Sequence, residues 1–233
     1  DTSLSVTAGK VQQYMQHRPK LQLVDVQGPR AYRRSHIPGS IHVPFSLVLH
    51  KSFLHSAPVI LINSGANPAP LFRLCRKLRQ KGIQASVLWG GMTAWMETNG
   101  RLTGQWREHR TLNKISPATY FRQRKHKYWQ IFYLGEKRPQ NFETIIPQAK
   151  YVLGISQLIS HLKQDNDLRL VLLLTTNGRG YEHLESTLRN KAISNIFCLK
   201  GGLNAYNRYL QMLKRPQMNK QKTQCPTCPN IIQ

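Results

Sequence analysis

The sequence predicts an α/β protein made of two similar domains, each with a central, mostly parallel sheet between two layers of helices. Two observations lead to this prediction. Apolar runs of strand length alternate with amphipathic segments of helical length, which is the pattern of parallel strands joined by helices. Three short landmarks also occur twice, in the same order and about 110 residues apart. An extended basic C-terminal tail completes the expected architecture.

The landmarks are an Ile-Pro element, a glycine-containing loop and a double glycine. The recurring pairs are "IPGSIHVP" (37–44) and "IPQAKYVL" (146–153), "LINSGANP" (61–68) and "LTTNGRGY" (174–181), and "VLWGGMTAW" (87–95) and "FCLKGGLNAY" (197–206). Their nearly constant spacing predicts two copies of one domain. We expect domain 1 at residues 1–100, a linker at 101–113, domain 2 at 114–212 and the basic tail at 213–233.

Each copy is expected to contain the same elements in the same order. A short helix (6–16; 116–124) precedes a strand (21–26; 129–134) and an irregular stretch that ends in the Ile-Pro element. A buried strand (58–63; 168–174), a helix after the glycine loop (70–82; 181–190) and a last strand that enters the double glycine (85–91; 195–202) follow. In the helix at 70–82, Pro70 suits the first turn, Gly82 suits the C-terminal end, and apolar residues recur on one face.

The charge of the chain restricts its partners. The 233 residues carry a formal net charge of +24, from 34 basic and 10 acidic residues. Such a field attracts acidic proteins, anionic lipid, nucleic acid or small oxyanions, although a solvated basic surface with no dedicated partner is the alternative. No apolar run reaches the roughly 18 residues of a membrane span, so no transmembrane segment is expected and membrane contact would be peripheral.

The four cysteines are too few for a disulfide scaffold in a chain of this length. Cys75 and Cys198 fall at positions expected in the core. The chain starts at Asp1 rather than Met, and together with the charge and a CxxC pair this leads us to expect an exported, periplasmic protein. A cytoplasmic location is the alternative.

The residues of the first copy resemble the rhodanese family, in its tandem two-domain form. "LVDVQGPRAYRRSHIPGSIHVPF" (23–45) is similar to the family's opening signature of a strand, an Asp, an aromatic residue and His-Ile-Pro-Gly, with Asp25, Tyr32 and His36 in those places. "VLWGGMTAW" is similar to the family's Gly-Gly-x-x-x-Trp landmark. The resemblance extends to about residue 212 and is weaker in the second copy, where Tyr133 is near the expected Asp and Tyr206 replaces the Trp.

The resemblance implies transfer of sulfane sulfur from thiosulfate or mercaptopyruvate to cyanide or a protein thiol. The family's nucleophile is a Cys that opens the glycine loop, where backbone N–H groups and a helix dipole stabilise its thiolate. Thr175 takes that place in the second copy, and Ile62, Asn63 and Ser64 compete for it in the first. None of them is Cys, and a Thr hydroxyl cannot hold a persulfide, so we expect both sites to be inactive.

The glycine loop of the second copy can still bind an anion through its backbone N–H groups and one Arg. The candidate residues are Thr175, Thr176, Asn177, Gly178, Arg179 and Gly180. The competing interpretation is a loop kept because the fold needs the turn. The first loop is a poorer candidate, because Pro68 and Pro70 lack an N–H and the loop has no Arg.

Six further residues are expected to be structural. Asp25 pairs with an Arg or caps the signature loop, and His36 fixes that loop through a hydrogen bond. The double glycines make the turns after the last strands, at Gly90, Gly91, Gly201 and Gly202. No Ser/His/Asp arrangement, paired-carboxylate site or phosphate-loop motif is recognisable, and we expect neither a cofactor nor a metal.

The tail contains a single CxxC, formed by Cys225 and Cys228. It could be a disulfide or redox pair, half of a metal site, a thiol contact to a partner, or a pair with no special role. An extended tail could also bring one of these thiols into an empty loop and supply the missing nucleophile.

These observations favour a catalytically inactive, tandem rhodanese-like binding or scaffold protein that recognises an acidic protein or an anionic ligand, within a larger assembly. The first alternative is a sulfurtransferase or sulfur carrier that uses the cysteines of the tail. The second is charge-driven binding of nucleic acid or an anionic membrane. Nucleic acid is not the expected partner, because no known nucleic-acid module is present.

Overall fold

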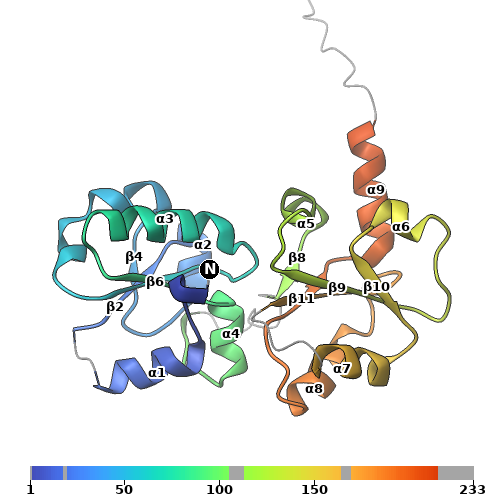
Figure 1. The fold of residues 1–233 in the computed structure, drawn as a ribbon, viewed down its shortest axis with the longest axis horizontal. Helices are drawn as coiled ribbons and strands as arrows, with labels where there is room; N and C mark the ends of the chain where they lie inside the picture. Colours follow the sequence, from blue (N-terminus) through green and yellow to red (C-terminus); the bar gives the residue numbers. More distant parts are fainter. Residues whose placement is uncertain (1, 18–19, 105–112, 164–168, 215–233) are drawn as a thin grey trace, which may run out of the picture.

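The computed structural model describes residues 2–17, 20–104, 113–163 and 169–214, which form two α/β halves (Figure 1). The first half contains a five-stranded parallel sheet with the strand order β1-β6-β5-β2-β4. Its strands are β1 (Ser5–Val6), β2 (Gln22–Asp25), β4 (Ile41–His42), β5 (Val59–Ile62) and β6 (Ala85–Leu88).

The second half contains a parallel sheet with the order β10-β9-β11-β12-β8. Its strands are β8 (Lys114–Ile115), β9 (Trp129–Leu134), β10 (Ala149–Val152), β11 (Leu170–Leu174) and β12 (Ile196–Leu199). Counted from the edge strand β8, this order matches that of the first sheet counted from β1. A separate antiparallel pair joins β3 (Ser35–His36) to β7 (Thr103–Gly104).

Helices cover both faces of each sheet (Figure 1). In the first half, α3 (Pro68–Gln80) lies on one face, and α1 (Ala8–His17) and α4 (Gly91–Glu97) lie on the other. In the second half, α5 (Pro117–Gln123) and α9 (Gly202–Lys214) lie on one face, and α7 (Ile155–Lys163) and α8 (Tyr181–Asn190) on the other. Shorter helices are α2 (Pro29–Arg34), α6 (Phe142–Ile145) and the 3-10 turns η1 (Thr2–Leu4), η2 (Phe45–His50) and η3 (Ser52–His55).

The strands of both halves are buried on two faces, as the continuous apolar runs predict. In β5, Val59 and Leu61 face the core under α3, whereas Ile60 and Ile62 face the core under α1 and α4. This alternation follows from the period of two along a strand. The fold class predicted from the sequence, α/β with mostly parallel sheets, is therefore confirmed.

Helix α3 begins two residues earlier than expected, at Pro68, since both prolines fit into its first turn, where no N–H is needed. It ends at Gln80, and Gly82, with a φ of 79°, reverses the chain so that the N–H of Ile83 bonds back to the carbonyl of Leu78. This is the glycine-ended helix terminus that the sequence predicted.

One hydrophobic core is continuous between the halves. Phe72 of α3 and Trp89 after β6 pack against Tyr128, which precedes β9, with ring centroids 5.9 and 6.1 Å apart. The halves are therefore joined by aromatic packing as well as by the chain.

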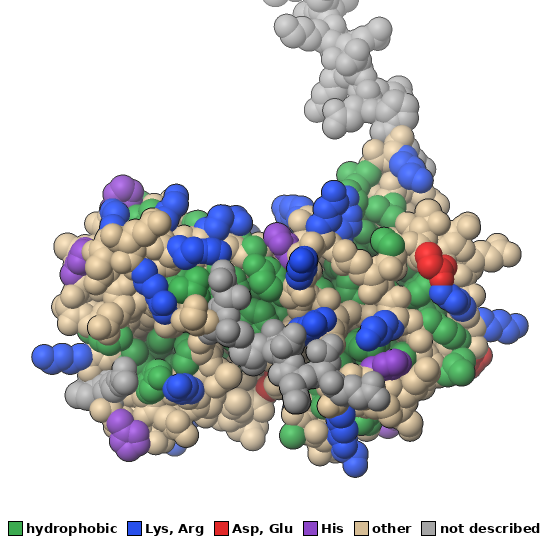
Figure 2. Space-filling model, viewed as in Figure 1, with side chains coloured by type: hydrophobic (Ala, Val, Ile, Leu, Met, Phe, Trp, Pro, Cys, Tyr) green, Lys and Arg blue, Asp and Glu red, His purple; other side chains and the backbone are tan. Residues whose placement is uncertain are grey.

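Figure 2 shows Lys and Arg side chains distributed over the visible face of both halves. Within the described ranges, no helix is both long and apolar enough to cross a membrane.

Candidate functional site

The glycine loops of the two halves follow equivalent central strands. Asn63 follows β5 and its carbonyl accepts the N–H of Met92 at 2.8 Å; Thr175 follows β11 and its carbonyl accepts the N–H of Leu203 at 2.9 Å. The same bond to the helix after the double glycine identifies Asn63 as the counterpart of Thr175. Of the three residues left open by the sequence, Asn63 therefore occupies the first position of the first loop.

The double glycines hold these loops in place. Gly90, Gly91, Gly201 and Gly202 all have positive φ, between 53° and 72°. A Cβ on Gly91 would lie 2.3 Å from the Asn63 carbonyl oxygen, and one on Gly202 would lie 2.2 Å from that of Thr175. Only glycine permits this approach of helix to loop in either half.

The first loop is closed by its own side chains and by the second half. The Asn63 amide donates to the Asn67 carbonyl and accepts the N–H of Gly65, both at 2.8 Å. Gly65 and Ala66 are buried, and a Cβ on Gly65 would lie 3.1 Å from the Phe197 ring of β12. The loop from Asn63 to the first residue of α3 is also one residue shorter than its counterpart, so it has little room for a ligand.

The second loop is open to solvent, and the Thr175 hydroxyl lies within it. Thr175 Oγ1 accepts the N–H of Gly178 and donates to the carbonyl of Arg179, both at 3.1 Å. Asn177 Oδ1 accepts the N–H of Arg179 at 3.1 Å. The Thr175 hydroxyl thus donates its proton to a backbone carbonyl and has no base among its partners, so it is not arranged as a nucleophile.

Other donors of the second loop stay available for an anion. The backbone N–H groups of Thr176, Asn177 and Gly180 make no hydrogen bond within the described part of the chain. The side chains of Thr176, Asn177 and Arg179 are exposed, and α8 begins at the next residue after Gly180. Three N–H groups, a guanidinium and a helix start therefore border one exposed turn, which is the arrangement that receives oxyanions.

Two tyrosines that the sequence did not single out as site residues hold this loop. The buried Tyr181 hydroxyl donates to the Leu199 carbonyl at 3.0 Å and accepts the N–H of Thr175 at 3.2 Å, and burial raises its pKa to about 12. The Tyr133 hydroxyl lies 2.9 Å from Thr176 Oγ1. Tyr133 pairs in register with Leu174 as Asp25 pairs with Ile62, so it occupies the position of the signature Asp.

Replacing Tyr181 with Phe is expected to loosen the second loop. The variant keeps the ring in its buried site but leaves the Thr175 N–H and the Leu199 carbonyl without this partner. Because Leu199 is buried and Thr175 is half-buried, we expect the free energy of unfolding to fall by roughly 1–3 kcal/mol, mainly from the Leu199 carbonyl. Urea denaturation measures this loss, and an unchanged midpoint would contradict the role assigned to the hydroxyl.

Asp25 and His36 lie in the signature loop of the first half. Asp25 is fully buried and accepts the backbone N–H of Gln27 at 2.8 Å and its side-chain amide at 3.0 Å. Burial raises the pKa of Asp25, while the bonds from Gln27 act in the opposite direction. His36 Nδ1 contacts the Tyr32 carbonyl at 2.8 Å, and the two rings stack 4.1 Å apart. Both side chains are engaged in local contacts of this loop.

The two described cysteines are buried thiols. Cys75 donates to the Ala85 carbonyl at 3.2 Å, and Cys198 donates to Glu185 Oε1 at 3.0 Å. Burial raises the pKa of both thiols, which disfavours the reactive thiolate. Cys225 and Cys228 lie outside the described residues.

Glu97 was not among the residues predicted from the sequence to be functional, and it links the two halves. Its carboxylate at the end of α4 accepts the N–H groups of Asn195 at 2.6 Å and Ile196 at 3.2 Å, at the start of β12. Burial raises the pKa of Glu97 to about 7 despite these bonds. Glu97 is the first acidic residue after Asp25 and lies in an otherwise basic stretch. This isolation is the feature of the sequence that could have identified it as a candidate.

Comparison with known families adds an assignment for the first half. Residues 7–98 match the family described as "Rhodanese-like domain", so this part of the chain is a rhodanese-like domain. No curated protein matches the chain.

Among the described residues, no group of three or more His, Cys, Asp or Glu is arranged to hold a metal ion.

Solved structures to which parts of this chain are similar include rhodanese-like proteins. The rhodanese-like domain of an Anabaena protein is 20% identical, with a TM-score of 0.40, over 46% of this chain and 83% of that domain. A rhodanese-like domain protein from Staphylococcus aureus is 22% identical, with a TM-score of 0.35, over 39% of this chain and 89% of that one. A thiosulfate sulfurtransferase from Pseudomonas aeruginosa is 16% identical, with a TM-score of 0.38, over 88% of this chain and 42% of that enzyme.

Proposed function

We propose that the chain is a tandem rhodanese-like protein that has lost sulfur transfer and acts as a binding or scaffold protein, through the exposed loop Thr175–Gly180. The observation that carries this proposal is the identity of the first loop residue in each half. Asn63 and Thr175 occupy equivalent positions, and neither side chain can form a persulfide. The matching strand orders of the two sheets support the tandem interpretation.

The ligand of the loop is an oxyanion or the carboxylate of an acidic protein. Three N–H groups that have no partner among the described residues, together with Arg179, support anion recognition at the second loop, whereas the first loop is covered. The net charge of +24 would bring acidic partners to the surface, and the loop would add a specific contact. This binding needs no thiol, so it is independent of the cysteines of the tail.

Titration of the intact chain with thiosulfate, followed by calorimetry, tests the proposal. We expect saturable binding that the Arg179→Gln variant weakens roughly tenfold, since one charge-assisted contact is lost. Arg30→Gln, which removes an exposed charge from α2 of the first half, serves as the matched control and should leave binding unchanged. Equal weakening by both variants would show attraction by net charge alone and would reject the loop as the site.

A further inference from the structure

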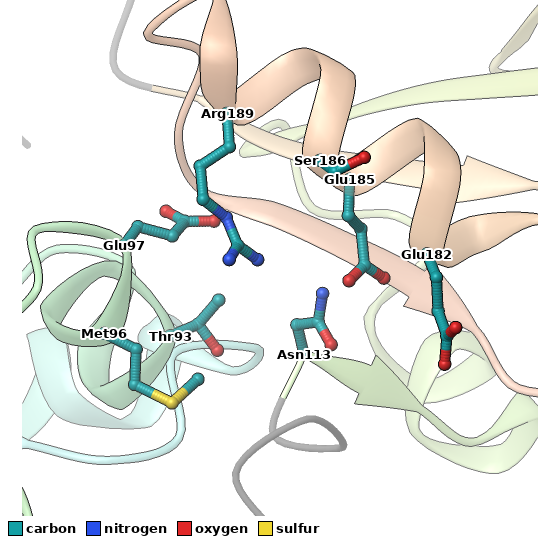
Figure 3. Close-up of a pocket in the computed structure, with 8 residues that line it drawn as sticks. All are labelled: Thr93, Met96, Glu97, Asn113, Glu182, Glu185, Ser186 and Arg189. Carbon is teal, nitrogen blue, oxygen red and sulfur yellow. The ribbon is translucent and has the colours of Figure 1, made fainter.

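A cavity of about 490 Å³ lies between the two halves, bordered by α4 from the first and α8 from the second (Figure 3). A volume of this size accommodates a small molecule. The lining residues that determine its chemistry are Met96, Glu97, Asn113, Glu182, Glu185 and Arg189. Because both halves contribute, neither half forms the cavity alone.

The charge of this cavity is opposite to that of the protein. Three carboxylates line it, although the whole chain has only 10 acidic residues against 34 basic ones. Among the described lining residues Arg189 is the one Lys or Arg, and in Figure 3 it lies toward Glu97, away from Glu182. A cavity with an excess of carboxylates disfavours the anions that the rest of the surface attracts, and it favours a cation.

Two buried polar side chains in the wall have few hydrogen-bond partners among the residues that the structure describes. Asn113 is 7% exposed, and its amide makes no hydrogen bond within the described part of the chain. Glu185 is 9% exposed, and its one partner there is the weak thiol donor of Cys198. Figure 3 shows both side chains directed into the space between α4 and α8. Since buried amides and carboxylates are normally satisfied, these groups have hydrogen-bonding capacity that a ligand in the cavity could use.

The arrangement does not suit a metal ion. The described residues hold no cluster of three or more metal-ligating side chains, because Glu182 and Glu185 lie one turn apart on α8 and Glu97 lies on the opposite wall. Both Glu97 oxygens already accept N–H groups from the start of β12. The Met96 side chain adds an apolar surface to the cavity. Separated acceptors with an apolar wall fit an elongated organic cation.

We propose that this cavity is a binding site for a small aliphatic amine with one or two primary ammonium groups. Glu185 and the Asn113 amide oxygen would accept one ammonium group, Glu182 would attract the other, and Met96 would contact the aliphatic chain. The ligand would contact both halves and so would stabilise their arrangement. This inference is separate from the proposed function, because it uses different residues and a ligand of opposite charge.

Calorimetric titration of the intact chain with 1,4-diaminobutane tests the inference. We expect saturable binding, whereas the neutral 1,4-butanediol gives none. The net charge of +24 opposes adventitious attraction of a cation, so saturation is diagnostic. Glu185→Gln keeps the shape of the side chain and should weaken binding at least roughly tenfold, since it removes a buried charge partner. Glu182→Gln changes an exposed residue and should weaken it less.

Glu136→Gln is the matched control, since this exposed carboxylate lies outside the cavity. It should bind 1,4-diaminobutane as the unmodified chain does. If 1,4-diaminobutane shows no saturable binding up to about 10 mM, the proposal is overturned, because the Kd is then too weak for a dedicated binding site. Equal weakening by Glu136→Gln and Glu182→Gln would also overturn it. Either result leaves thiosulfate binding at the Thr175–Gly180 loop intact.

Discussion

The Thr175→Cys variant is expected to react with iodoacetamide at least roughly tenfold faster than the Asn63→Cys variant. A thiol at position 175 would lie in an exposed loop with free N–H groups, next to Arg179 and the start of α8. These groups lower the pKa of a thiol and increase its thiolate fraction. A thiol at position 63 would lie in a shorter loop that packs against Phe197.

Both variants are made with Cys225→Ser and Cys228→Ser, so that the cysteines of the tail do not contribute. Cys75 and Cys198 give little background, because they are buried and their pKa values are raised. Alkylation rates followed by mass spectrometry give the comparison. Equal rates at the two positions would contradict the difference between an open and a closed loop.

A second large effect is expected at Glu97. Burial raises its pKa to about 7, from an ordinary value of 4.5. Between these values the folded chain holds a proton that the unfolded chain has released, so the free energy of unfolding falls as pH rises through this range. The expected decrease is about 2–3 kcal/mol between pH 4.5 and pH 7. Above pH 7 the carboxylate is ionised in both the folded and the unfolded chain, and this contribution to stability is lost.

The Glu97→Gln variant isolates this effect from the histidines, which titrate in the same range. We expect its free energy of unfolding, measured by urea denaturation at several pH values, to show a smaller decrease than that of the unmodified chain. Glu97→Ala should be less stable than Glu97→Gln at every pH, since it leaves the N–H groups of Asn195 and Ile196 without an acceptor. Parallel pH profiles for the unmodified chain and Glu97→Gln would show that Glu97 is not the titrating group.

The sequence allowed the central strands and the helices α1, α3, α5 and α8 to be predicted, because their signals are local, whereas α4, α7 and α9 were not predicted. The apolar run at 129–134 coincides with β9, and the segment at 181–190 coincides with α8. The edge strands β1 and β8 were missed, since two residues each are too few for a periodic pattern. The stretch before the Ile-Pro element, expected to be irregular, contains α2 in the first half and α6 in the second.

The candidate site was only partly accessible to such reasoning. Counting back from Gly178 located Thr175, but the first loop is one residue shorter, so only its hydrogen bonds distinguish Asn63 from Ile62 and Ser64. Asp25 was expected to pair with an Arg or to cap its loop, and its bonds within the described ranges come from Gln27. The cavity between the halves depends on long-range contacts of Glu97 and Asn113, which no local pattern encodes.

The loss of sulfur transfer at both loops is tested most directly by an assay of thiocyanate formation from thiosulfate and cyanide. The intact chain is assayed beside the Cys225→Ser/Cys228→Ser double variant. We expect no turnover by either protein, because Asn63 and Thr175 cannot carry sulfane sulfur. Turnover by both proteins would contradict the claim, and turnover that disappears in the double variant would make the cysteines of the tail the nucleophile and the chain a sulfurtransferase.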